Sequence, residues 1–298
     1  MAILPTHKYG ITLREHCRIM VKDEKLTYLQ QDKAYQKFWA IPYGNLNVLM
    51  LGTGTSITQA AARLLSEQGV MLAFVGGGGM PLFLASQSEY RPTEYFQQWC
   101  GFWWDESKRL KAAQFFQQQR CTFIKQSWKR IPALAEAGIM PDTAIDNFLE
   151  KLATAKDNQQ LMGYEANFSK ALYRVLAEHF GHPKFTRDQG KGDPFDLFNS
   201  YLDHGNYLAY GLAASVLWVL GISHAMPVSH GLTRRGALVF DLADIIKDGA
   251  ILPNAFASAA AKYSDQEMRN QCIGFLDESS ALSYMFTQVK AVLEHVAR

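Results

Sequence analysis

The chain has 298 residues, of which 48% are hydrophobic and 19% charged, a composition that excludes an intrinsically disordered protein. Its net charge is only +2, so any nucleic-acid binding would depend on clustered rather than abundant basic residues. The four cysteines lie far apart without a C-x-x-C pair, which disfavours a structural zinc site and a disulfide framework and favours a reducing compartment.

The N-terminal sequence MAILPTHKYG lacks a basic start followed by an apolar run, so it predicts no signal peptide. The most apolar stretch, YLAYGLAASVLWVLGI (207–222), is shorter than the roughly 18 residues that indicate a membrane span. It predicts a buried core helix. We therefore expect a cytoplasmic protein that makes no membrane contact.

The first part of the chain predicts a strand-rich domain. An amphipathic helix is expected within TGTSITQAAARLLSEQG (53–69), with Ser56 and Gln59 as a capping box and Gly69 as its end. GGGG (76–79) predicts a hairpin turn. The β-prone segments are 16–21, 26–31, 47–52, 70–75 and 80–86.

The sequence changes character near Ser86. The segment QSEYRPTEY (87–95) is polar and contains Pro92, as is typical of a linker. Beyond it, apolar residues recur at helical spacing. The sequence thus predicts an α+β protein, with a β-rich domain at residues 1–87 followed by a mainly α-helical domain at 88–298.

The segment 102–130 combines seven lysines and arginines with interleaved aromatic residues. A basic helical face of this kind could follow a nucleic-acid backbone. The alternative is a solvated charged face over an aromatic core, and the segment alone favours this alternative.

The stretch HGLTRRGALVFDLADIIKD (230–248) contains two aspartates that would project from one face of a helix, Asp241 and Asp244. Asp241 could be a helix N-cap with Asp244 in the positive first turn. The two carboxylates could equally belong to a functional site. Their spacing alone does not decide between these interpretations.

His230 precedes these carboxylates, with Arg234 and Arg235 nearby. A histidine, carboxylates and arginines together are typical of a site for phosphate esters. Such oxygen-rich donors suit Mg²⁺ or Mn²⁺, and arginine binds phosphate through paired hydrogen bonds. Glu165, in GYEANFSKALY (163–173), could add a carboxylate, although taken alone it is better explained as a first-turn glutamate that interacts with the helix dipole.

Four stretches together resemble the integrase and endonuclease subunit of CRISPR spacer acquisition, the family usually called Cas one, and most closely its type I-F branch. The resemblance covers nearly the whole chain. One departure is a short connection before SEYRPTEY, where that branch usually has an insertion. The stretches are LGTGTSITQAA (51–61), SEYRPTEY (88–95), LDHGNYLAYGLAA (202–214) and HGLTRRGALVFDLADIIKD (230–248).

The resemblance implies that the helical domain is catalytic and that Glu165, His230 and Asp244 bind the metal ion, Mg²⁺ or Mn²⁺. Asp241 would be a further catalytic residue that supports the site. Residues matching positions near DNA are Asn206, Arg234, Arg235 and Lys247.

The implied reaction is phosphoryl transfer on double-stranded DNA. The 3′-hydroxyl of a short prespacer would attack a phosphodiester at the boundary of a CRISPR repeat, and water in its place would give a nuclease. The implied partners are a second copy of the chain and a small CRISPR-associated subunit, which in type I-F is typically fused to a helicase–nuclease. Two alternatives remain: a non-catalytic DNA-binding scaffold of the same complex, and an unrelated metal-dependent phosphoesterase.

Overall fold

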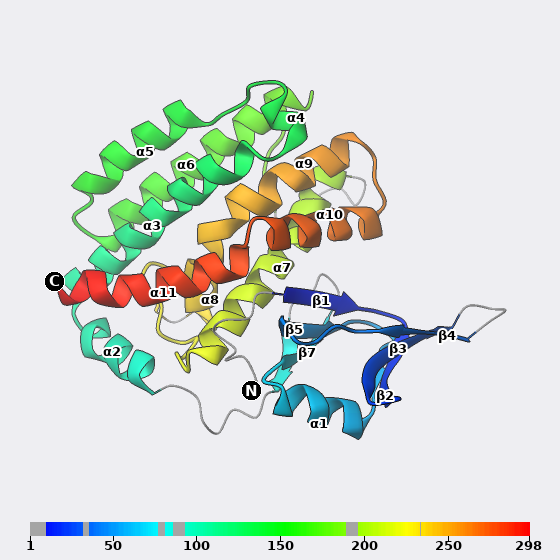
Figure 1. The fold of residues 1–298 in the computed structure, drawn as a ribbon. Helices are drawn as coiled ribbons and strands as arrows, with labels where there is room; N and C mark the ends of the chain where they lie inside the picture. Colours follow the sequence, from blue (N-terminus) through cyan, green and yellow to red (C-terminus); the bar gives the residue numbers. More distant parts are fainter. Residues whose placement is uncertain (1–9, 32–35, 77–80, 86–92, 189–195, 233) are drawn as a thin grey trace. The chain divides into compact units, whose positions relative to one another are not determined.

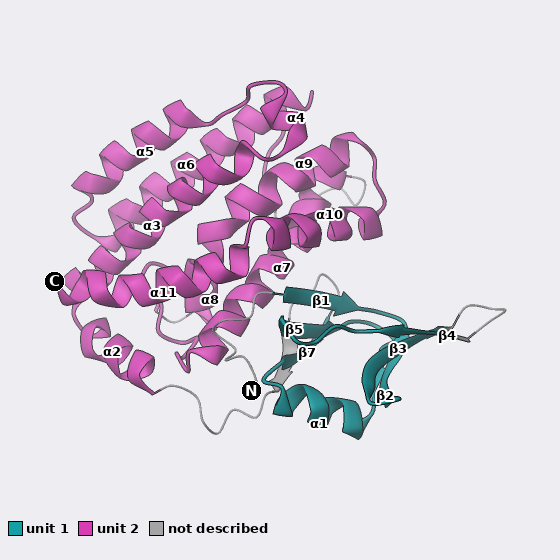
Figure 2. Cartoon of the chain, in the orientation of Figure 1, with its two compact units in different colours: residues 1–92 teal, residues 93–298 magenta. Residues whose placement is uncertain are grey.

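The computed structural model describes residues 10–298 except 32–35, 77–80, 86–92, 189–195 and 233. The chain divides into two compact units, residues 1–92 and 93–298 (Figure 2). The first is rich in strands and the second is helical, so the predicted α+β fold class is confirmed. The predicted boundary between residues 87 and 88 lies outside the described residues, as does the predicted glycine turn apart from Gly76.

The first unit contains two four-stranded sheets. One has the order β1-β5-β7-β8, with β1, β5 and β7 parallel and β8 antiparallel to β7. The other has the order β4-β3-β2-β6, in which β2, β3 and β4 form an antiparallel meander. The strands are β1 (Gly10–Arg14), β2 (Cys17–Lys22), β3 (Lys25–Gln31), β4 (Gln36–Ala40), β5 (Leu46–Leu51), β6 (Ser56–Ile57), β7 (Met71–Val75) and β8 (Pro81–Ala85).

The helix of this unit, α1 (Gln59–Glu67), begins later than the sequence suggested. Its N-cap is Thr58, whose hydroxyl accepts from the Ala61 N–H at 3.4 Å. The predicted capping box is wrong, because Ser56 pairs with β2 as part of β6. The predicted end is correct: Gly69 has a φ of +64°, a left-handed conformation that glycine adopts without a side-chain clash.

The second unit is a bundle of helices (Figure 1). Helix α3 packs against α5, α6, α8 and α11, while α7 packs against α8 and α9. Its helices are α2 (Glu94–Trp103), α3 (Glu106–Trp128), α4 (Pro132–Ala135), α5 (Asp142–Thr154), α6 (Asn158–His179), α7 (Leu197–Val219), α8 (Ala237–Ile246), the π-helical turn η4 (Lys247–Ile251), α9 (Leu252–Ala260), α10 (Asp265–Glu278) and α11 (Ala281–Ala297).

The apolar stretch near residues 207–222 forms most of α7, whose central residues from Leu208 to Leu217 are largely buried. This confirms the prediction of a core helix. Of the helices in the described part of the chain, none has the length and apolar character that crossing a membrane requires. All four cysteines are free thiols, as their spacing predicted.

A π-helical turn separates α8 from α9. In this turn the Leu252 N–H donates to the carbonyl of Lys247, five residues earlier. The turn lies against α3, where a Cβ atom on Gly249 would come within 2.5 Å of the Phe123 ring. The Trp128 indole N–H donates to the carbonyl of Asp248 at 2.9 Å. Helix α3 therefore fixes the segment that follows Asp241 and Asp244.

Candidate functional site

The predicted site residues lie in the helical unit, around the contact between α3, α6 and the α8–η4 segment. Glu165 is in α6, where it is preceded by two helical turns. Asp241 and Asp244 are inside α8, which begins at Ala237 after an N-cap at Gly236. The interpretations of Glu165 as a first-turn residue and Asp241 as an N-cap are therefore both wrong.

Asp241 is fully buried and accepts hydrogen bonds from the loop that carries His230. Its Oδ2 atom accepts from the main-chain N–H of Val228 at 2.6 Å and of Ser229 at 3.3 Å. Its Oδ1 atom accepts from the main-chain N–H of His230 at 3.0 Å and from the Ser229 hydroxyl. A buried carboxylate satisfied by main-chain donors fixes the loop in place.

The same Oδ1 atom lies 2.7 Å from Nδ1 of the His230 ring. Asp241 thus favours the tautomer that carries the proton on Nδ1 and leaves the lone pair on Nε2, the arrangement common to histidines that bind metals. Burial alone would lower the pKa of His230, but the contact with Asp241 and the charge of Asp244 raise it. Burial would raise the pKa of Asp241, but the contacts with His230, together with the hydrogen bonds from Ser229 and Val228, lower it.

Arg120 of α3 joins Glu165 to the α8–η4 segment. Its guanidinium is fully buried and donates to Glu165 Oε1 at 2.7 Å and, from Nε, to Asp248 Oδ2 at 2.7 Å. It also donates to the Gln117 side chain at 3.0 Å and to the Ser169 hydroxyl at 2.8 Å. Ser169 in turn donates to Glu165 Oε1 at 2.8 Å.

These contacts keep the Glu165 carboxyl ionised. Burial alone would raise its pKa, but the charges of Arg120 and Lys247 and the hydrogen bonds from Arg120 and Ser169 lower it to about 2. Glu165 is therefore an anion at neutral and mildly acidic pH.

Asp244 lies in α8 with its side chain 5% exposed, and its Oδ1 atom is 2.6 Å from Nζ of Lys247. This atom has no hydrogen-bond partner of good geometry among the described residues, so the ion pair satisfies it only in part. Burial would lower the pKa of Lys247, but the charges of Asp244 and Asp248 raise it. The buried oxygen of Asp244 is thus suited to a stronger cationic partner.

The charges of this cluster fit a divalent cation. The carboxylates are Glu165, Asp241, Asp244 and Asp248, and the permanent cations are Arg120 and Lys247, so two negative charges remain uncompensated when His230 is neutral. The side chains are not gathered into a metal cage, however: within the described ranges, no three His, Cys, Asp or Glu side chains are placed to hold one ion. The donors fit Mg²⁺ or Mn²⁺ in type, and the assignment of Glu165, His230 and Asp244 as ligands stays a prediction.

The residues predicted to contact DNA differ in how far they are exposed to solvent. Arg234 and Arg235 are exposed in the loop before α8, and the Arg234 guanidinium lies over the Phe240 ring at 3.8 Å. Asn206 is half-buried in α7. Lys247 is mostly buried and paired with Asp244, so in this arrangement it presents no free charge to a surface ligand.

The segment 102–130, mostly α3, does not present all its basic residues to solvent. Arg109 and Arg120 are buried, with Arg120 at the centre of the cluster. Arg120 is not among the site residues that the sequence predicted. A signal was present, because at helical spacing Arg120 shares a face with Phe116, Phe123 and Ile124, all of them buried.

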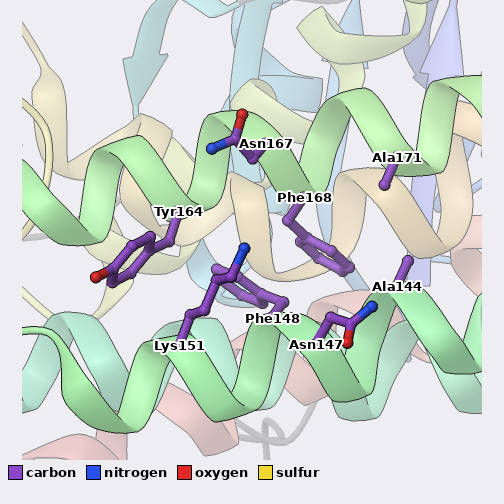
Figure 3. Close-up of a pocket in the computed structure, with 8 residues that line it drawn as sticks. All are labelled: Ala144, Asn147, Phe148, Lys151, Tyr164, Asn167, Phe168 and Ala171. Carbon is purple, nitrogen blue, oxygen red and sulfur yellow. The ribbon is translucent and has the colours of Figure 1, made fainter.

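A hollow of about 180 Å³ lies between α5 and α6 (Figure 3). The rings of Phe148 and Phe168 line it and stack with their centroids 4.4 Å apart, and Tyr164 and Lys151 also line it. Phe168 also packs under Arg120, whose guanidinium carbon is 5.2 Å from the ring centroid. The hollow and the carboxylate cluster therefore share Phe168 as a wall.

The family model described as CRISPR associated protein Cas1 matches residues 11–267. The chain is 43% identical over 308 aligned positions to the CRISPR-associated endonuclease Cas1 of Pseudomonas aeruginosa (strain UCBPP-PA14), covering 98% of this chain and 95% of that protein. It is 42% identical to the CRISPR-associated endonuclease Cas1 of Pectobacterium atrosepticum, covering 99% of this chain and 95% of the relative. The chain therefore belongs to the Cas1 family, as its motifs indicated.

Solved structures share the fold. The crystal structure of the TtCas1–DNA complex has a TM-score of 0.69 at 24% identity, covering 95% of this chain and 91% of that one. A casposase bound to integration product has a TM-score of 0.71 at 14% identity, covering 96% and 91%. The Cas6-RT-Cas1–Cas2 complex has a TM-score of 0.66 at 13% identity, covering 99% of this chain and 36% of that one.

Proposed function

We propose that this protein is a metal-dependent DNA endonuclease and integrase of CRISPR spacer acquisition. It inserts short DNA fragments into a CRISPR array when the 3′-hydroxyl of a fragment attacks a phosphodiester at the repeat boundary. Hydrolysis by water at the same site gives the endonuclease activity. The two relatives at 42–43% identity are both named CRISPR-associated endonucleases, which supports the nuclease part of the proposal.

The observation that carries the proposal is the buried carboxylate cluster of the helical unit. Its carboxylates outnumber its permanent cations: Glu165 is paired with Arg120 and Asp244 with Lys247. The contact of Asp241 with Nδ1 of His230 leaves the Nε2 side of that ring for a ligand. A cluster of this composition in a Cas1 chain is explained more simply by a divalent ion than by fold stability, since buried charges stabilise a fold weakly.

Glu165, His230 and Asp244 would hold the ion. When bound, a Mg²⁺ or Mn²⁺ ion supplies positive charge next to the scissile phosphate and the leaving oxygen. Asp241 holds the His230 ring and its Nδ1 proton, so that Nε2 stays a lone-pair donor. Lys247 pairs with Asp244, and where a bound ion takes over that carboxylate, the charge of Lys247 would become available to stabilise a phosphate.

The DNA substrate and the protein partners belong to the same proposal. The exposed Arg234 and Arg235 beside the site suit contacts to a DNA backbone. The fold is shared with a Cas1 protein in a DNA complex and with the Cas1 part of a complex containing Cas2. We infer a homodimer of the type I-F branch, in the cytoplasm, that works with a small partner subunit fused to a helicase–nuclease.

The test is cleavage of branched and linear duplex DNA by the purified full chain, with Mn²⁺, Mg²⁺ or EDTA. Wild type should cleave only with metal. Glu165→Gln and Asp244→Asn should cleave at least a hundredfold more slowly while they bind DNA as wild type does. Equal cleavage by all three proteins would contradict the site assignment.

The same experiment tests the alternative of a non-catalytic scaffold. Such a protein would bind DNA but would not cleave it under any condition. The unrelated phosphoesterase is set aside by the family match over most of the chain. Binding of DNA that weakens steeply with salt would argue against it further.

A further inference from the structure

Arg120 is a fully buried cation at the centre of the cluster, with 0% of its side chain exposed. Its donors reach two carboxylates on different elements, Glu165 of α6 and Asp248 of η4. Neither Arg120 nor Asp248 is among the predicted metal ligands or DNA contacts. Burying a guanidinium costs several kcal/mol unless its donors are satisfied, so this placement requires an explanation.

We propose that Arg120 and Asp248 form a positioning pair that holds Glu165 ready for the divalent cation. The inference rests on the proposed function, since it assigns a role toward the same metal site. Arg120 is a positioning residue rather than a catalytic one, because it acts through Glu165.

The direction of the Arg120 contacts supports this role. Both hydrogen bonds that Glu165 accepts from described residues, from Arg120 and from Ser169, reach Oε1. The second oxygen, Oε2, is therefore left for a ligand. A planar guanidinium that donates at a fixed angle holds the carboxylate plane in one orientation, which the flexible ammonium group of a lysine would not do.

Asp248 prevents Arg120 from competing with the metal ion. An unshared guanidinium would place its whole charge on Glu165 and weaken the attraction of that carboxylate for a second cation. Asp248 Oδ2 instead accepts from both Nε and one terminal nitrogen of Arg120, and so takes up part of that charge.

The position of Asp248 is fixed independently of Arg120. Its main-chain carbonyl accepts from the Trp128 indole, and Gly249 lets the π-helical turn approach the Phe123 ring closely. Trp128 and Phe123 belong to the same helix as Arg120. Helix α3 therefore carries Arg120 and also holds Asp248 in place. Through these two residues it sets the position of Asp248 relative to Glu165, the carboxylate that Arg120 orients.

The test measures Mn²⁺ affinity of the full chain by electron paramagnetic resonance, without DNA and without activity. The main variant is Arg120→Gln/Asp248→Asn, which removes one charge of each sign and leaves two amides that can bond to each other. If the cluster acted by net charge alone, this variant would bind Mn²⁺ as wild type does. Positioning instead predicts affinity that is weaker by roughly 10–100-fold, as for other groups that orient metal ligands.

The matched control is Lys125→Gln/Asp146→Asn, which likewise removes one charge of each sign, in an exposed ion pair between α3 and α5 whose Nζ and Oδ1 atoms lie 3.3 Å apart. It should leave the Mn²⁺ affinity unchanged. If the main variant fails to fold, Ser169→Ala removes one hydrogen bond to Glu165 without a change of charge, and several-fold weaker Mn²⁺ binding is expected.

Wild-type affinity in the folded main variant, or in folded Ser169→Ala where the main variant does not fold, would overturn the positioning pair and leave the proposed function intact. Failure of wild type itself to bind Mn²⁺ at millimolar concentrations would overturn the metal-dependent function and the pair with it. A lower melting temperature with unchanged Mn²⁺ affinity would show that the pair is only structural.

Discussion

One oxygen atom of Asp241 contacts both the main chain and the ring of His230. Oδ1 accepts from the His230 main-chain N–H at 3.0 Å and lies 2.7 Å from Nδ1 of the ring. The first contact fixes the loop and the second fixes the ring, so a single buried carboxylate sets both the position and the tautomer of the histidine.

Asp241→Asn should destabilise the metal-free protein by about 2–4 kcal/mol, because an amide presents N–H groups to donors that need an acceptor. Urea unfolding in EDTA measures this loss. The same exchange at exposed Asp146 is the control and should cost less than about 0.5 kcal/mol. Equal losses at both positions would contradict the role of Asp241.

The His230–Asp241 contact also predicts a pH dependence. The folded-state pKa of His230 is raised above its ordinary value of 6.5, so its contribution to stability is fully present below pH 6.5 and is lost as pH rises through the folded-state pKa. In EDTA, the melting-temperature difference between wild type and His230→Gln should therefore be larger at pH 5.5 than at pH 8.5. A difference that grows with pH would contradict the contact.

Glu165 should contribute to the loss of folding stability at acidic pH. Its pKa falls from 4.5 to about 2 on folding, so the stability it contributes is present above pH 4.5 and is lost as pH falls toward 2. Glu165→Gln should flatten the decline of melting temperature between pH 5 and pH 3. An unchanged slope would mean that Arg120 does not hold this carboxylate as an anion.

Gly249→Ala should destabilise the protein by about 1–3 kcal/mol, because the added methyl group would overlap the Phe123 ring. It should also weaken Mn²⁺ binding by displacing Asp248. Gly274→Ala in α10 is the control, since a Cβ there meets nothing within 4 Å, and it should be neutral or slightly stabilising. Thermal unfolding with and without Mn²⁺ compares the two variants.

Arg234→Gln and Arg235→Gln should each weaken DNA binding to a similar extent for all DNA sequences. Each should also lower the slope of the logarithm of affinity against the logarithm of salt concentration by about one. Fluorescence anisotropy over a range of salt concentrations measures both effects. Lys262→Gln, at an exposed position outside the predicted contacts, is the control. An unchanged salt dependence in both arginine variants would remove this loop from the DNA interface.

The sequence predicted the order of the two units, the core helix and the glycine that ends α1, because these depend on local patterns of polarity and conformation. It failed at the start of α1. Ser56 and Thr58 could each cap that helix, and the pairing of Ser56 with the distant strand β2 decides between them.

At the site, motif matching found His230, Asp241, Asp244 and Glu165, but helix boundaries obtained from spacing misplaced two of them. Glu165 and Asp241 lie inside helices that begin earlier than their apolar patterns suggest. Arg120 was missed because its partners, Glu165 and Asp248, are distant in sequence, and only the fold brings them together.

The most direct test of the central claim is strand transfer into a supercoiled plasmid that carries a repeat array. The reaction would contain a short duplex with free 3′-ends, Mn²⁺ or Mg²⁺ and the partner subunit, with wild type, His230→Ala and Asp244→Ala compared. We predict joined product with wild type and none with either variant. Equal joining by all three proteins would contradict the assigned site, and salt-sensitive DNA binding without joining by any of them would favour a non-catalytic scaffold.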